Sequence, residues 1–273
     1  MNPVKVINHK HNIITPDWPT PDYVNAFVTT RSSFQDSTAS DAVSTGYDFF
    51  NTALHVNDDT EKVLHNRQTL AEHLNVQNSN ITWLEQVHGT DIIRSETSHS
   101  SRPAPIADAC TSSTQNHVCT IMTADCLPVL FCKVTHNKIE QKVAAAHAGW
   151  RGLADGILSK TLSEFSQPES VIAWLGPAIS QEHFEVGQEV YDAFISQNPK
   201  NKAAFDTSPN TRADKPKWLA SLTQLAKIEL HEKGIKAIYG GNFCTYKQSD
   251  LFYSYRRDGA QSGRMASLIM ISE

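Results

Sequence analysis

The sequence lacks any apolar run that could cross a membrane. A membrane-spanning helix needs about 18 or more mostly apolar residues in succession, and no stretch of the chain provides them. Residues 1–21 also lack the apolar segment that a secretory signal requires. These absences predict a protein that is neither exported nor inserted in a membrane, and we therefore expect it in the cytoplasm.

Cysteine and positive charge are also scarce. The 5 cysteines are odd in number and show no paired spacing, which argues against a disulfide framework and leaves at least one thiol free for chemistry. A formal net charge of -5 argues against a general nucleic-acid binder, because such proteins are usually basic. It still allows a small anionic substrate, since a few arginines can form a local positive pocket.

Short apolar runs and helical apolar spacing are interleaved along the chain. We expect strands at 23–30, 81–84, 118–122, 128–134, 142–146, 170–175, 235–239 and 265–271. We expect helices at 58–74, 153–165, 181–195 and 218–233, loops at 32–44, 95–105 and 198–217, and an irregular stretch at 1–22. No repeat or linker divides the chain. The pattern predicts the α+β class, with residues 1–273 forming a single compact unit in which a mixed β-sheet is flanked by helices.

Three segments place a possible metal ligand at the end of an apolar strand, with a turn residue directly after it. They are His88 in QVHGT, Cys126 in TADCLP and His147 in AHAGWRG. Such turns bring side chains from separate strands to one rim of a sheet, where sites are commonly built. Two imidazoles and a thiolate suit zinc, and three protein ligands leave the fourth position open, as in catalytic zinc sites. The segments WLGPA (174–178) and 252–264 are also unlike ordinary core or surface.

The spacing of these three residues along the sequence does not by itself distinguish metal ligands from residues with a purely structural role. A histidine after a strand is often only a hydrogen-bonded structural residue, and the three positions lie far apart in the sequence. Cys119 and Cys132 lie inside strand-like runs, where a cysteine packs as a small hydrophobic side chain. Cys126 differs from them, because Asp125 precedes it and Pro128 interrupts the strand pattern soon after it.

The same segments resemble the YfiH-type family, also called laccase-domain or multicopper polyphenol oxidase proteins. QVHGTDI, TADCLPVL, AAAHAGWRGL, WLGPAI with FEVGQEV, and FYSYRRDG with SGRMASLI occur in the family's order. The resemblance covers residues 24–271 and implies that His88, Cys126 and His147 are the metal ligands. The chain departs from the family after Arg31, where Ser32-Ser33 replaces the usual Gly-Gly pair. The shape of that loop is therefore open, whereas the metal site is unaffected.

The family is also described as purine nucleoside phosphorylases with adenosine deaminase activity. The resemblance therefore implies a zinc enzyme that acts on purine nucleosides and phosphate, with adenosine, inosine and methylthioadenosine as substrates. A peptidoglycan-editing role is attached to some relatives and could follow indirectly from such small-molecule chemistry. The deaminase signature H-x-E with P-C-x-x-C is absent from the sequence, so deamination here would be an unrelated solution to that chemistry.

Phosphorolysis needs a base pocket, a phosphate site and stabilisation of the charge that develops as the glycosidic bond breaks. The chain leads from Trp150 and Arg151 into a predicted helix, whose first N–H groups could hold an anion together with the Arg151 guanidinium. Trp150 could stack on a base or fill the core. Arg67 and Arg151 are the preferred phosphate-binding pair, because each lies in a family-matching motif, and substitution of either should impair phosphorolysis more than deamination.

Other residues have less specific roles. Asp125 and Glu85 are candidate proton carriers. Arg31 and Arg264 are expected to bind substrate, and Arg256 and Arg257 are further phosphate candidates, although any of these arginines could be an ordinary surface residue.

Two other enzyme classes remain as alternatives. A cysteine with two histidines also resembles a blue-copper site, so copper and laccase chemistry are possible. Four-copper oxidases carry several H-x-H pairs, however, and this chain has one, formed by His9 and His11. A metal-free hydrolase could instead use Cys126 as nucleophile and His147 as base, but it would need no second imidazole. A non-enzymatic binding module does not account for five polar turn motifs.

Overall fold

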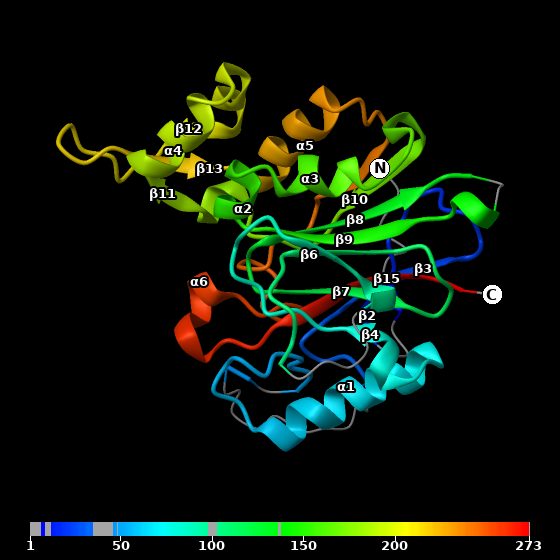
Figure 1. Cartoon of the computed structure of the whole chain (residues 1–273). Helices are drawn as coiled ribbons and strands as arrows, with labels where there is room; N and C mark the ends of the chain where they lie inside the picture. Colours follow the sequence, from blue (N-terminus) through cyan, green and yellow to red (C-terminus); the bar gives the residue numbers. More distant parts are fainter. Residues whose placement is uncertain are drawn as a thin grey trace.

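The computed structural model of the chain describes residues 7–8, 12–34, 46–47, 49–97, 103–135 and 138–272. Its strands form two large sheets and a small one (Figure 1). The first sheet has the order β1 (Ile7–Asn8), β2 (Ile13–Ile14), β3 (Val24–Thr29), β15 (Met265–Ile271), β7 (Val118–Thr123) and β4 (Ile81–Thr82). Its neighbours are antiparallel except β4 and β7.

The second sheet has the order β14 (Ile238–Gly240), β10 (Val171–Leu175), β8 (Leu127–Lys133), β9 (Val143–Ala148), β6 (Ala109–Ser112) and β5 (Ile92–Arg94). Its central pairs are antiparallel, and the pairs at its two edges are parallel. The third sheet joins β11 (Glu185–Gly187), β13 (Lys217–Ala220) and β12 (Phe205–Thr207) in antiparallel pairs.

The two large sheets are stacked, with helices on their outer faces (Figure 1). Side chains alternate along the strands. In β8, Leu130 and Cys132 pack between the sheets, whereas Val129 and Phe131 pack against helices α3 (Ile157–Ser163) and α5 (Leu222–Glu232). On the far side, alternate residues of β7 and β15 pack against α1 (Thr60–Leu74). Strands β7, β8 and β15 are thus buried on both faces. The remaining helices are α2 (Trp150–Ala154), α4 (Gln188–Ile195) and α6 (Tyr255–Asp258).

Local sequence determines where helix α1 begins and ends. The carboxylate of Asp59 accepts the backbone N–H of Lys62 and caps its first turn. Asn75 adopts a left-handed conformation (φ 53°) and ends it. The helix expected at 153–165 is instead two helices, α2 and α3, because Gly156 between them has a φ of +84° that is incompatible with a continuous helix.

The structure confirms the α+β class with flanking helices, and it divides the expected sheet into two stacked sheets. Two helix predictions are partly wrong. Within 181–195 only α4 is an α-helix, and β11 lies before it; within 218–233 the chain first forms β13 and then α5. The expected loop at 198–217 also contains β12. These short strands are stabilised by pairing with one another across the chain, which local periodicity cannot show.

Strands β5 and β6 lie on either side of the expected loop at 95–105 and were not predicted. The expected loop at 32–44 and the irregular stretch at 1–22 lie partly outside the described residues, as do His9 and His11. Among the described residues, no helix combines the length and the apolarity that a membrane crossing needs.

Candidate metal centre and its cavity

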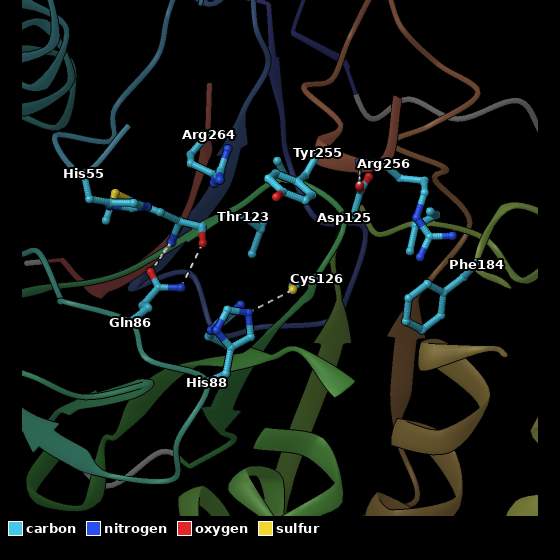
Figure 2. A pocket seen from close by; sticks show the side chains of 14 residues that line it. His55, Gln86, His88, Thr123, Asp125, Cys126, Phe184, Tyr255, Arg256 and Arg264 are labelled. Carbon is cyan, nitrogen blue, oxygen red and sulfur yellow. Dashed lines mark hydrogen bonds between the residues drawn. The ribbon is translucent and has the colours of Figure 1, made fainter. Parts of the chain in front are cut away.

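The fold brings the three sequence-predicted ligands together. His88 lies in the connection from β4 to β5 and Cys126 in the connection from β7 to β8, and each of these connections leads from the first sheet to the second. His147 lies on β9, opposite Pro128 of β8. The side-chain atoms that could bind a metal lie within 4.8 Å of one another. Cys126 Sγ is 3.7 Å from His88 Nε2 (Figure 2).

These three residues form a group that could hold a metal ion. Two imidazole nitrogens and one thiolate sulfur are the donor types that zinc prefers, and copper accepts the same set. The backbone leaves little room beside them, because a Cβ atom at Gly149 would lie 2.7 Å from His88 Cδ2 and 3.0 Å from Cys126 Sγ. Only glycine at this position allows the chain to pass so close to two of the ligands.

Asp108 lies beside two of the candidate ligands and was not predicted from the sequence. Its side chain is fully buried. It accepts a hydrogen bond from His147 Nδ1 at 2.8 Å and from the backbone N–H groups of Val87, His88 and Gly89. The available signal was a single carboxylate in the apolar run from Ile106 to Cys110, which is an unusual place for an unpaired charge.

The electrostatics of the group favour a thiolate beside an imidazolium when no metal is bound. Burial alone would raise the pKa of Cys126, but the neighbouring His147 and His88 outweigh it and lower this pKa to about 6. Burial would lower the pKa of His147, but the Cys126 thiolate and Asp108 raise it to about 9. Burial likewise acts to raise the pKa of Asp108, and its bonds to His147 and the backbone lower it overall. A deprotonated thiol is the form that binds metals.

A cavity of about 360 Å³ opens beside the three residues (Figure 2). This volume lies within the range of small-molecule sites. Among the described residues, 14 line it: His55, Gln86, His88, Met122, Thr123, Ala124, Asp125, Cys126, His147, Ile179, Phe184, Tyr255, Arg256 and Arg264. The lining therefore combines the candidate metal group with aromatic rings and two arginines.

Three of the other predicted site residues, Asp125, Arg256 and Arg264, line this cavity. Arg264 precedes β15, and its Nη1 donates to the carbonyl oxygens of Ser262 at 2.5 Å and Gly263 at 2.9 Å. Asp125 lies beside Cys126 with a φ of 92°, and both of its carboxylate oxygens accept hydrogen bonds. Oδ1 accepts from the Thr245 hydroxyl, and Oδ2 from the backbone N–H of Arg256, each at 2.6 Å. Asp125 thus ties α6 to the loop that carries Cys126.

Arg67 lies behind the cavity wall and is not among the described residues that line it. Its Nε donates to the carbonyl oxygen of Thr52 at 2.8 Å, and its Nη2 is 3.7 Å from the sulfur of Met122, which does line the cavity. Its guanidinium carbon lies 3.9 Å from the centre of the Trp83 ring. Arg67 therefore supports the segment 52–55 and one wall from behind.

Besides Arg67, five other predicted residues lie outside the described lining. Arg257 donates through Nη1 to the carbonyl oxygens of Thr245 at 2.9 Å and Tyr246 at 3.0 Å. Arg151 is exposed, with its guanidinium 4.4 Å from the Trp150 ring, and Trp150 packs against the core beneath the helices. Arg31 donates to the carbonyl oxygen of Ser249 at 2.9 Å. Glu85 is exposed on the surface.

Further lining residues were not identified from the sequence. Gln86 clamps the His88 segment to β7, because its side-chain amide both donates to and accepts from the backbone of Met122. Thr123 is buried, and its hydroxyl has no hydrogen-bond partner within the part of the chain that the structure describes. Phe184 and Tyr255 supply aromatic rings from separate segments (Figure 2). Each of these four residues lies in a segment that resembles the family (QVHGTDI, TADCLPVL, FEVGQEV and FYSYRRDG), so the motifs were the signal that could have found them.

Known proteins resemble this chain over most of its length. The profile of a family described as "Multi-copper polyphenol oxidoreductase laccase" matches residues 32–272. A purine nucleoside phosphorylase of Pseudomonas aeruginosa is 42% identical over 261 residues, covering 95% of this chain and 98% of that protein. The purine nucleoside phosphorylase YfiH of Escherichia coli is 43% identical over 262 residues, with the same coverage of each chain.

Solved structures show the same fold. A crystal structure of a Neisseria meningitidis protein superposes with a TM-score of 0.84 at 39% identity, covering 96% of this chain and 100% of that one. YlmD of Geobacillus stearothermophilus superposes with a TM-score of 0.79 at 26% identity, covering 92% and 93% of the two chains.

Proposed function

The chain belongs to the multi-copper polyphenol oxidoreductase laccase family, and from this membership and the names of its relatives we propose that it is a zinc-dependent purine nucleoside phosphorylase that also deaminates adenosine. The observation that carries the proposal is the composition of the cavity. A His–Cys–His group, two aromatic rings and two arginines line one space of small-molecule size. Adenosine, inosine and methylthioadenosine are the expected substrates.

His88, Cys126 and His147 would hold the zinc ion. When bound, zinc supplies a Lewis acid that polarises an oxygen or a water next to the substrate. The apo geometry leaves the ligand atoms close to one another and open to the cavity. The same ion can therefore serve both phosphorolysis and deamination.

The aromatic walls suit the purine base. Tyr255 and Phe184 reach the cavity from opposite sides of the Asp125–Arg256 link (Figure 2), and a planar heterocycle gains dispersion and stacking energy between such rings. The buried hydroxyl of Thr123 can supply a hydrogen bond to the substrate. A buried polar group without a partner is costly, so a substrate that bonds to this hydroxyl would be stabilised.

Arg264 is the arginine best placed to bind phosphate. Two carbonyl oxygens hold its Nη1, and its remaining N–H groups donate to no group within the described residues. Arg256 is less suitable, because its Nη1 donates to the carbonyl oxygens of His183 and Glu185. In phosphorolysis a phosphate oxygen bonds to the ribose C1′ while the bond from C1′ to the base breaks. A guanidinium beside that oxygen would position it and offset charge.

Asp125 fits a positioning role in this scheme. Both of its oxygens already accept hydrogen bonds from Thr245 and Arg256, so it holds α6, and with it Tyr255, against the cavity. Proton transfer by Asp125 would require it to give up one of these bonds.

Since the residues that line the cavity range from His55 to Arg264 along the chain, we propose that both sheets act as one functional unit. A cytoplasmic location would keep the Cys126 thiol reduced.

The donor set of the metal group also keeps copper-dependent oxidation of phenols as a second candidate. The test loads the metal-free protein separately with zinc and with copper, and measures adenine, inosine and hypoxanthine from adenosine with and without phosphate. Zinc-loaded protein should release adenine with phosphate and inosine without it. Zinc-loaded protein that converts no nucleoside, together with copper-loaded protein that consumes oxygen with phenols faster than free copper, would establish the oxidase instead.

A substitution separates the metal role of Cys126 from a metal-free mechanism. Cys126→Ala should abolish both nucleoside reactions, because it removes a ligand of the shared ion. Cys132→Ala is the matched control, since Cys132 is buried in the core away from the cavity and burial raises its pKa to about 12. Activity that survives a chelator but is lost on thiol alkylation would point to a cysteine hydrolase.

A further inference from the structure

One buried carboxylate organises two of the three candidate metal ligands. Asp108 Oδ1 accepts from the backbone N–H of His88 at 3.0 Å and from His147 Nδ1 at 2.8 Å. Its Oδ2 accepts from the N–H groups of Val87 at 3.2 Å and Gly89 at 2.7 Å. Asp108 is fully buried, so these four donors replace the water that a carboxylate otherwise needs.

The bond to His147 determines which of its ring nitrogens faces the other ligands. An ionised carboxylate can only accept, so the His147 nitrogen that contacts it, Nδ1, must carry a proton. In the neutral ring the lone pair then lies on Nε2, the nitrogen left to point toward Cys126 and His88. The strand register supports this orientation, because the backbone N–H of His147 donates to the carbonyl oxygen of Asp108 at 2.7 Å.

The other three bonds hold the turn that carries His88. His88 has a φ of 61°, a left-handed conformation that residues other than glycine rarely adopt. Three successive N–H groups, from Val87 to Gly89, point at the same carboxylate and form a small anion-binding concavity. The strained backbone is therefore held in place by the group that also orients His147.

We propose that Asp108 is the positioning residue of the metal centre, which presets both histidines before any ion binds. It touches neither the ion nor the substrate and acts through His88 and His147. The inference rests on the proposed function only in taking the His–Cys–His group as the metal site.

The Asp108→Asn substitution tests this role at the level of single atoms. The amide has one acceptor oxygen and one NH₂ group, whereas all four neighbours of Asp108 are donors. With NH₂ toward Val87 and Gly89, it opposes two backbone N–H groups and loosens the His88 turn. If the NH₂ group faces His147, the Nδ1 atom of His147 has to accept a hydrogen bond. The ring proton then moves to Nε2, the atom that would otherwise bind the metal. Either orientation should weaken metal binding.

The experiment measures the dissociation constant for zinc by chelator competition in the wild type, Asp108→Asn and Asp91→Asn. Asp91 is an exposed aspartate near the same turn and serves as the matched control, since its removal changes charge equally. We expect Asp108→Asn to bind zinc about 10- to 100-fold more weakly, as for other groups that orient metal ligands, and Asp91→Asn to bind like the wild type. Equal affinity of wild type and Asp108→Asn, or equal weakening by both substitutions, would overturn the inference. A wild type that binds no zinc would instead overturn the metal site itself.

A second measurement uses the wild type alone, in case Asp108→Asn does not fold. Long-range ¹H–¹⁵N spectra of the zinc-loaded protein with ¹⁵N-labelled histidine report which ring nitrogen of His147 carries the proton. We expect Nδ1 to be protonated and Nε2 to be shifted by the metal. A proton on Nε2 would refute the positioning role, and so would a metal shift at Nδ1.

Discussion

The substitution Gly149→Ala adds one methyl group between two candidate metal ligands. The φ of Gly149 is -64°, which any residue can adopt, so the backbone tolerates the change. The new Cβ would lie 2.7 Å from His88 Cδ2 and 3.0 Å from Cys126 Sγ. Because nonbonded carbon atoms settle about 3.5–4.0 Å apart, the His88 ring must move by roughly 1 Å. Asp108 holds the turn behind it, so the ring itself has to absorb the shift.

The expected loss of zinc affinity follows from how little metal–ligand distances can vary. Metal–ligand distances vary by only about 0.2 Å around their usual values, so a ligand displaced by roughly 1 Å leaves the coordination shell. In the metal-free protein the His88 ring is partly exposed and can turn aside. The cost of overpacking, about 1–3 kcal/mol, should therefore appear mainly in the metal-bound state. Zinc affinity is then expected to fall by about 5- to 150-fold, with little change in the unfolding temperature of the metal-free protein.

The assay combines zinc titration against a chelator with thermal unfolding of the metal-free protein. Gly89→Ala is the matched control, because a Cβ there would make ordinary contacts, 3.5 Å from Asp108 Oδ2 and 3.6 Å from Val87 Cγ2. Its zinc affinity should stay within about threefold of the wild type, in line with a surface-type substitution of at most about 0.5 kcal/mol. The reasoning would be refuted if Gly149→Ala bound zinc as tightly as the wild type, or if both alanine variants lost affinity equally.

Three other predictions follow from the cavity. Arg264→Ala should raise the KM for phosphate by about 10- to 100-fold, the loss expected for hydrogen bonds to a charged group, and should affect deamination less. Arg212→Ala, at an exposed position, is the control. A larger effect from Arg67→Ala or Arg151→Ala would place the phosphate site elsewhere. Thr123→Val should raise the KM for nucleoside without lowering zinc content, and an unchanged KM would remove Thr123 from the substrate site. In the metal-free protein, alkylation of Cys126 should be half-maximal near pH 6, because its pKa is lowered to about 6 and the thiolate forms above that pH. A midpoint near pH 8.5, the usual thiol value, would contradict the His147–Cys126 pairing, and Cys132 should stay unmodified throughout.

The local sequence marked the candidate ligands, and the resemblance to a known family implied that they bind a metal. His88 and Cys126 each follow an apolar strand, His147 lies near the end of one, and a turn residue comes within two residues of each. The capped helix α1 and the strand β15 were likewise predicted, because a periodic run in α1 and a continuous apolar run in β15 contain their whole signal. Features of this kind depend on neighbours along the chain, so a sequence displays them directly.

The tertiary structure alone decided which groups surround these ligands. In the sequence, Asp108 is only a single carboxylate within an apolar run. In the structure, the pairing of β6 with β9 places it beside His147. Arg264 faces the cavity and Arg151 faces solvent, although both lie in family-matching motifs. The strands β11 and β13 form because each supplies the hydrogen-bond partners of the other across about thirty residues of chain. Contacts between distant segments depend on how the two sheets stack, and no local pattern in the sequence records that arrangement.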